Sequence, residues 1–60
     1  LIMEIQEQVL EYLKEQGEPM KAGDIADALN LDKKAVSAAI TLLKAEQRIS
    51  SPKRCYYAAV

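Results

Sequence analysis

Hydrophobic residues recur at helical spacing in three segments of this 60-residue chain. The segments cover about residues 2–16, about residues 22–29 and about residues 33–47. Each segment repeats apolar side chains three or four positions apart, which predicts an amphipathic α-helix. In the first segment the apolar stripe has Leu10 at its margin and consists of Ile2, Ile5, Val9, Tyr12 and Leu13. In the second segment the inward residues are Ala22, Ile25, Ala26 and Leu29.

The third predicted helix divides into an apolar face and a small, basic face. The apolar face is expected to pack into the core and consists of Val36, Ala39, Ile40 and Leu43. The opposite face carries short, hydroxylic and basic side chains, namely Lys33, Lys34, Ser37, Ala38, Thr41 and Lys44. Such a face suits the major groove of DNA, although any amphipathic helix also exposes polar residues to solvent. This helix alone leaves both interpretations open.

Turn residues separate the three predicted helices. Gly17 supplies a left-handed residue at the end of the first helix, and Asn30 is expected to do the same after the second. Leu31 is then expected to return to the core, and Asp32 is a good N-cap for the third helix. The second and third helices are therefore joined by a three-residue turn, which is typical of a helix-turn-helix motif.

Short extended segments accompany these helices. Residues 20–21 form an extended pair that would add an edge strand to a small sheet. Near the C-terminus, residues 49–50 predict one strand, residues 51–54 a loop and residues 55–59 a second strand rich in β-favouring tyrosine. Within that second strand, Cys55 is expected to be a small apolar filler.

Composition places the chain among small folded domains. Half of the residues are hydrophobic, which is enough for one core, and no apolar run approaches the ~18 residues that cross a membrane. We therefore predict a small α+β fold, one domain over residues 1–60, with three helices and a C-terminal β-hairpin, or wing, at about residues 49–59. A single cysteine forms no internal disulfide, which fits a reducing cytoplasm.

The formal net charge of -1 hides a division along the chain. Residues 1–32 carry eight acidic and two basic side chains, a net charge of -6, and half of the acids are glutamates on the far side of the first predicted helix. Residues 33–60 carry six basic and one acidic side chain, a net charge of +5. A basic half indicates a polyanionic partner, from which the first helix should point away.

Catalytic patterns are missing from the sequence. The chain has no histidine, no Gly-rich phosphate loop and no metal-ligand spacing, and Cys55 has neither a second cysteine nor a base beside it. We therefore expect no enzymatic activity, no metal and no cofactor.

The order helix, extended pair, helix, helix, hairpin resembles the winged helix-turn-helix domains of prokaryotic transcription regulators, such as the MarR-like and ArsR-like families. The resemblance covers nearly the whole chain, and its most specific positions are Ala26, Leu29, Asn30, Leu31, Val36, Ser37 and Ile40. Asn30 and Gln47 stand where those families commonly have glycine. The resemblance implies a cytoplasmic protein that binds double-stranded DNA in transcription regulation, as a homodimer or within a larger regulator.

The resemblance also implies a set of DNA-binding residues. On the third helix, the residues that would face bases and phosphates are Lys33, Lys34, Ser37, Ala38 and Thr41, with Lys44 toward the backbone. In the wing, Lys53 and Arg54 would meet phosphates or the adjacent minor groove. Because positions 37, 38 and 41 hold no Arg, Asn or Gln for bidentate base contacts, phosphate contacts should supply most of the affinity, with weak sequence preference.

Two alternatives remain open at this point. The fold could serve protein contact instead, through the acidic first helix or through a third helix with little bulk at Ala35, Ala38, Ala39 and Ala45. The chain also loosely resembles the winged helices that bind left-handed Z-form DNA. This resemblance rests on Lys33, Lys34, Pro52, Tyr56 and Tyr57. Ser37 and Thr41 stand where that family has its key Asn and Tyr.

Overall fold

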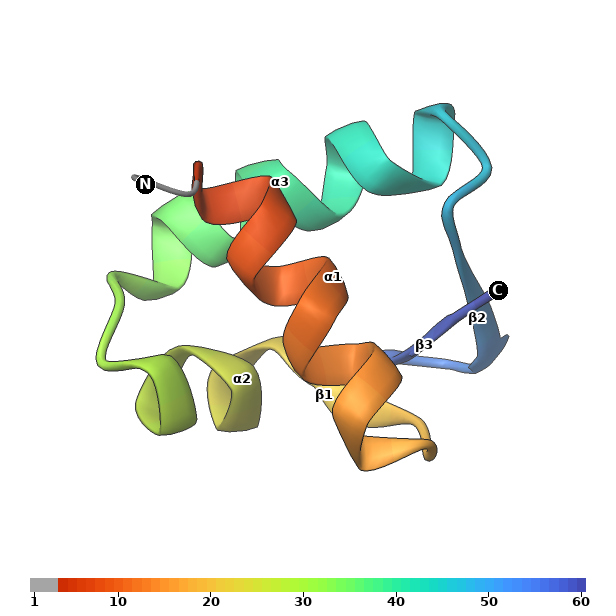
Figure 1. Cartoon of the computed structure of the whole chain (residues 1–60), viewed down its shortest axis with the longest axis horizontal. Coiled ribbons are helices and arrows are strands. Elements are labelled where there is room, and N and C mark those ends of the chain that lie inside the picture. The colour runs from red at the N-terminus through yellow and green to blue at the C-terminus, as the bar shows by residue number, and fades with distance from the viewer. Residues whose placement is uncertain (1–3) are drawn as a thin grey trace.

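The structure, a computed structural model that describes residues 4–60, contains three helices and a three-stranded sheet within that range (Figure 1). In chain order the elements are α1 (Ile5–Gln16), β1 (Met20–Lys21), α2 (Ala22–Leu29), α3 (Lys33–Ala45), β2 (Ile49–Lys53) and β3 (Tyr56–Ala59). The predicted α+β class with a C-terminal hairpin is therefore confirmed. The first helix was predicted from about residue 2, and positions 2–3 lie outside the described residues.

Helix α1 contributes a wider apolar side to the core than its sequence stripe predicts. Val9 and Leu13 are fully buried, as expected, whereas Ile5 and Tyr12 are only partly buried. Leu10, predicted at the margin, is 4% exposed and belongs to the core. The reason is tertiary, because Leu10 lies beside the residues that lead from α3 into β2 and beside the C-terminal residue, lining one hollow with Arg48 and Val60.

The turn between α2 and α3 follows the prediction. Asn30 has φ 57° and ψ 45°, which is the left-handed conformation. The backbone N–H of Leu31 donates to the carbonyl of Ala26 at 2.9 Å, and the N–H of Asn30 to that of Asp27 at 3.3 Å. This pair of bonds is a Schellman motif, which satisfies the last carbonyls of α2 and turns Leu31 back against the core.

Asp32 begins α3 as the predicted N-cap. Its carboxylate accepts a hydrogen bond from the backbone N–H of Ala35 at 3.3 Å. By contrast, the N-cap residue of α2 is Lys21, whose side chain makes no capping hydrogen bond.

We expect Asp32→Ala to lower the free energy of unfolding by about 1 kcal/mol, because the substitution removes the acceptor for a helix N–H. Asp32→Asn is the matched control, since asparagine caps a helix about as well as aspartate. Urea denaturation followed by far-UV circular dichroism measures both variants. An equal loss in the two would show that the negative charge, rather than the cap, is what matters.

The end of α3 differs from the prediction, because the helix ends at Ala45 and not at Gln47. Gln47 has φ 60°. The N–H of Arg48 donates to the carbonyl of Leu43 at 2.9 Å, and that of Gln47 to the carbonyl of Lys44 at 3.0 Å. Gln47 therefore occupies the left-handed position of a second Schellman motif, where the resembling families commonly have glycine.

The sheet is antiparallel with strand order β1-β3-β2. Strand β1 pairs with β3, Met20 opposite Tyr57 and Lys21 opposite Tyr56, which confirms the expected edge strand. Met20 and Tyr57, together with Ala59, pack against the core formed by the helices. The other face of the sheet is directed away from the helices.

The wing turn is shorter than predicted. Strand β2 runs through the expected loop to Lys53, with an irregular register between Ser50 and Lys53, and the turn lies at residues 54–55. The Ser51 hydroxyl lies 3.1 Å from the carbonyl oxygen of Lys53 and 3.0 Å from that of Tyr56, across the turn. These contacts extend the hairpin. The prediction for Cys55 was wrong, because this residue is exposed in the turn with φ 67°.

Candidate nucleic-acid interface

Helix α3 is held from behind and leaves its predicted binding face open. Its core side is at most 3% exposed and consists of Val36, Ala39, Ile40 and Leu43. The six predicted binding residues of this helix are all exposed, namely Lys33, Lys34, Ser37, Ala38, Thr41 and Lys44. The face is therefore accessible to a partner along the whole helix.

The two hydroxyl groups of this face differ in what they offer. The Thr41 hydroxyl donates to the backbone carbonyl of Ser37, one helical turn earlier, at 3.1 Å. With its proton engaged, the Thr41 oxygen is left as an acceptor for an approaching N–H group. The Ser37 hydroxyl makes no side-chain hydrogen bond within residues 4–60, so it can serve as donor or acceptor.

Lys33 lies against the start of α2. A Cβ atom added to Gly23 would come 3.2 Å from the Lys33 Cε atom and 3.6 Å from its Nζ atom. The glycine therefore provides the room in which the lysine side chain crosses α2. This packing brings a cation of α3 close to the N-terminal end of α2, where the helix dipole is already positive.

The wing carries the two predicted cations at its tip. Lys53 ends β2 and Arg54 follows in the turn, and both side chains are exposed. The Lys53 ammonium lies 5.4 Å from the centroid of the Tyr56 ring. Lys21 reaches the same ring, with its ammonium 5.5 Å from the centroid.

Lys21 is a cation of this surface that sequence reasoning missed. It lies in the acidic half of the chain and belongs to a strand of two residues, so that no local pattern connects it with the wing. Only the pairing of β1 with β3 brings it to Tyr56. The sequence signal that could have identified Lys21 was the expected edge strand at residues 20–21, because this strand carries one lysine.

The structure thus joins some predicted residues and leaves others apart. The Lys33 side chain lies beside Gly23, which is two residues after Lys21 in the chain. The ammonium groups of Lys21 and Lys53 both lie near the Tyr56 ring. These contacts connect the start of α3 with the wing through β1. The remaining predicted cations are exposed and make no ion pair or ring contact within the described part of the chain, namely Lys34, Lys44 and Arg54.

The acidic residues of α1 belong to a different surface. Helices α1 and α3 pack against each other through their buried sides (Figure 1). The outward side of α1 therefore points away from the outward side of α3, and it carries the exposed residues Glu7, Glu11 and Glu15. The fold separates these glutamates of α1 from the predicted binding face of α3, as expected from the charge distribution.

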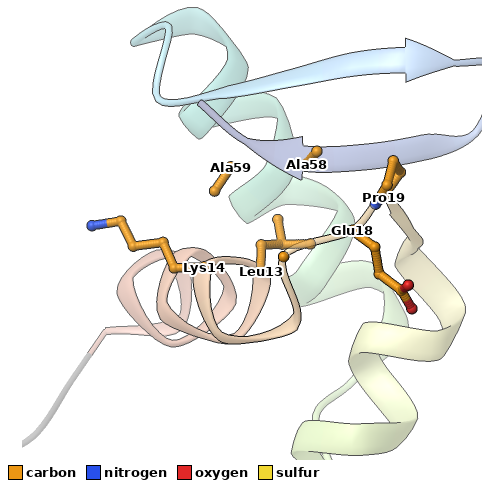
Figure 2. Close-up of a pocket in the computed structure, with 7 residues that line it drawn as sticks. Leu13, Lys14, Glu18, Pro19, Ala58 and Ala59 are labelled. Atoms are coloured by element: carbon orange, nitrogen blue, oxygen red, sulfur yellow. The ribbon is translucent and has the colours of Figure 1, made fainter.

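A pocket of about 290 Å³ lies elsewhere, between the end of α1 and β3 (Figure 2). Its lining consists of Leu13, Lys14, Gly17, Glu18, Pro19, Ala58 and Ala59. The charged ends of Lys14 and Glu18 point outwards on opposite sides in Figure 2, so the walls between them are small and apolar. None of the eight predicted binding residues lines this pocket, and it places no converging polar groups around a ligand.

Comparison with known families identifies the type of domain. Residues 5–57 match the family model described as "HTH domain". The matched region runs from the first residue of α1 into β3, and it includes the whole helix-turn-helix pair. Among curated proteins, no match is found. From its helices to its third strand, the chain belongs to the HTH domain family, and it is a helix-turn-helix DNA-binding domain.

Proposed function

We propose that this domain binds double-stranded DNA with α3 in the major groove and the β2–β3 wing on the neighbouring backbone, and that it acts in transcription regulation. The observation that carries the proposal is the set of exposed cations on α3 and at the wing tip that form no ion pair within the described residues. Within residues 4–60 the ion pair is formed by Arg48 and Glu46 at 3.8 Å. The cations left for an outside anion include Lys33, Lys34, Lys44, Lys53 and Arg54.

Phosphate contacts would supply most of the affinity. Each neutralised phosphate releases counterions and contributes about -0.9 to the slope of log affinity against log salt. Ser37 and Thr41 would bond to several different bases, and Ala38 offers a methyl group to thymine, so sequence preference should be weak. A single module reads one half-site, which favours action as a homodimer or within a larger regulator, as in MarR-like and ArsR-like proteins.

The expected place of action is the compartment that holds the DNA, which is the cytoplasm of a prokaryotic cell. Within residues 4–60, no helix combines the length and the apolar character needed to cross a membrane.

We expect a mixed-sequence duplex to bind the wild-type domain with a salt slope of about -4 to -5, since about four to six phosphates would be neutralised. Fluorescence anisotropy between about 50 and 200 mM salt measures the slope. In an NMR titration with the same duplex, amide shifts should concentrate on α3 and residues 53–54. Absence of binding at low salt would contradict the proposal, and so would shifts confined to α1.

A second candidate function is protein contact through α3. Leu42 is 51% exposed on this helix, and it stands four residues after Ala38 and three before Ala45, both of which are exposed. Such a strip would let another helix approach closely. Concentration-dependent association without DNA binding would favour this function. Sedimentation velocity measures that association.

A further inference from the structure

Lys21, Tyr56 and Lys53 form a row across all three strands of the sheet. The register places Lys21 opposite Tyr56 between β1 and β3, and Lys53 opposite Tyr56 between β2 and β3. Side chains directly opposite each other on neighbouring strands lie on the same face. Because Met20 and Tyr57 take the inner face, this row occupies the outer face of the sheet.

Both lysines of the row contact the same ring. Their ammonium nitrogens lie 5.5 Å and 5.4 Å from the Tyr56 centroid, within the range of cation–π attraction. The two nitrogens are therefore no farther apart than the sum of these distances. Neither one pairs with a carboxylate in the described part of the chain. The ring thus restrains two like charges on the strands that flank it, and an anion near both would relieve their repulsion.

The row continues the cationic surface of α3. Lys21 is the N-cap residue of α2, and the Lys33 side chain lies beside Gly23 in the first turn of that helix. At the other end of the row, Arg54 follows Lys53 at the tip of the wing. Through these contacts Lys21 lies between the start of α3 and the wing.

We propose that Lys21 and Lys53, held in place by Tyr56, bind phosphates of one DNA strand, so that Lys21 is a DNA-binding residue outside the helix-turn-helix pair. The proposal rests on the proposed function. One strand of a duplex carries a phosphate about every 3.4 Å along the axis, so two ammonium groups that contact one ring can both reach phosphates of the same strand. Tyr56 acts as a positioning residue, because its ring restrains two flexible side chains before DNA arrives.

The test compares Lys21→Gln with Lys14→Gln in anisotropy titrations of a mixed-sequence duplex. Lys14 is an exposed lysine of α1 and gives the matched loss of one charge. We expect Lys21→Gln to reduce the magnitude of the salt slope by about 1 and to weaken binding about five- to tenfold at 0.1 M salt. Lys14→Gln should leave the salt slope unchanged.

Two substitutions at Tyr56 test its positioning role. Tyr56→Phe keeps the ring and should bind DNA as the wild type does. Tyr56→Leu removes the ring and should weaken binding as Lys21→Gln does, while circular dichroism confirms that the variant is folded. Equal binding by Tyr56→Leu and Tyr56→Phe would overturn the role of the ring.

The outcomes separate this inference from the function on which it rests. If the wild-type domain fails to bind DNA at low salt, both the proposed function and the role of Lys21 are overturned. Wild-type binding with an unchanged slope in Lys21→Gln overturns this inference alone. An equal effect of Lys14→Gln would also overturn it, because net charge rather than a local contact would then explain the loss.

Discussion

Lys34→Glu is expected to weaken duplex binding by about one to two orders of magnitude at 0.1 M salt, because it removes one phosphate contact and adds a charge that repels another. Lys34 is exposed in the first turn of α3 and makes no ion pair within the described residues. Its loss therefore breaks no internal contact. Anisotropy titrations of a mixed-sequence duplex against salt measure the effect.

Fold stability should not explain this loss. A glutamate in the first turn of a helix interacts favourably with the helix dipole. We therefore expect the unfolding free energy of Lys34→Glu to equal that of the wild type or to exceed it slightly, as measured by urea denaturation.

The matched control is Lys14→Glu, which makes the same charge change on the exposed side of α1. The two variants have the same net charge, so any difference between them reports the position of the lysine. A similar loss of affinity in both would contradict a binding face on α3.

Leu43→Ala is expected to lower the free energy of unfolding by about 2–5 kcal/mol, because the substitution leaves a cavity in a closely packed core. Leu43 is fully buried on the core side of α3. A domain of this size has a total stability of about 3–9 kcal/mol, so the substitution should remove a large part of it. Urea denaturation followed by circular dichroism measures the loss.

The adjacent residue gives the control for this prediction. Leu42→Ala removes the same atoms from the same helix, but Leu42 is 51% exposed. Its effect should stay within about 0.5 kcal/mol, as for most surface substitutions. Comparable losses at both positions would mean that α3 does not pack with the orientation described.

The helix-turn-helix junction was predictable from the chain because its causes are local. Asn30 tolerates the left-handed conformation and Asp32 caps the N–H of Ala35, and both effects act within a few residues. The burial of Leu43 beside an exposed Leu42 likewise follows from helical periodicity. These residues determine the fold class and the open face of α3 without reference to distant segments.

The wing depended on contacts that no local pattern contains. Ser51 reaches carbonyl oxygens across the turn, and this extends β2 and leaves Cys55 exposed at φ 67° instead of inside a strand. β-propensity predicts that strands occur here, but it does not decide where their pairing stops.

Some residues of the candidate binding surface could be predicted from the sequence, and one could not. The cations of α3 and of the wing tip follow from the basic half of the chain and from helical spacing, and those residues were predicted. Lys21 joins them only because β1 pairs with β3, which brings residues distant in the chain against one ring. Strand pairing and side-chain packing are long-range contacts, and so Lys21 and Lys53 come together at Tyr56 only in the folded chain.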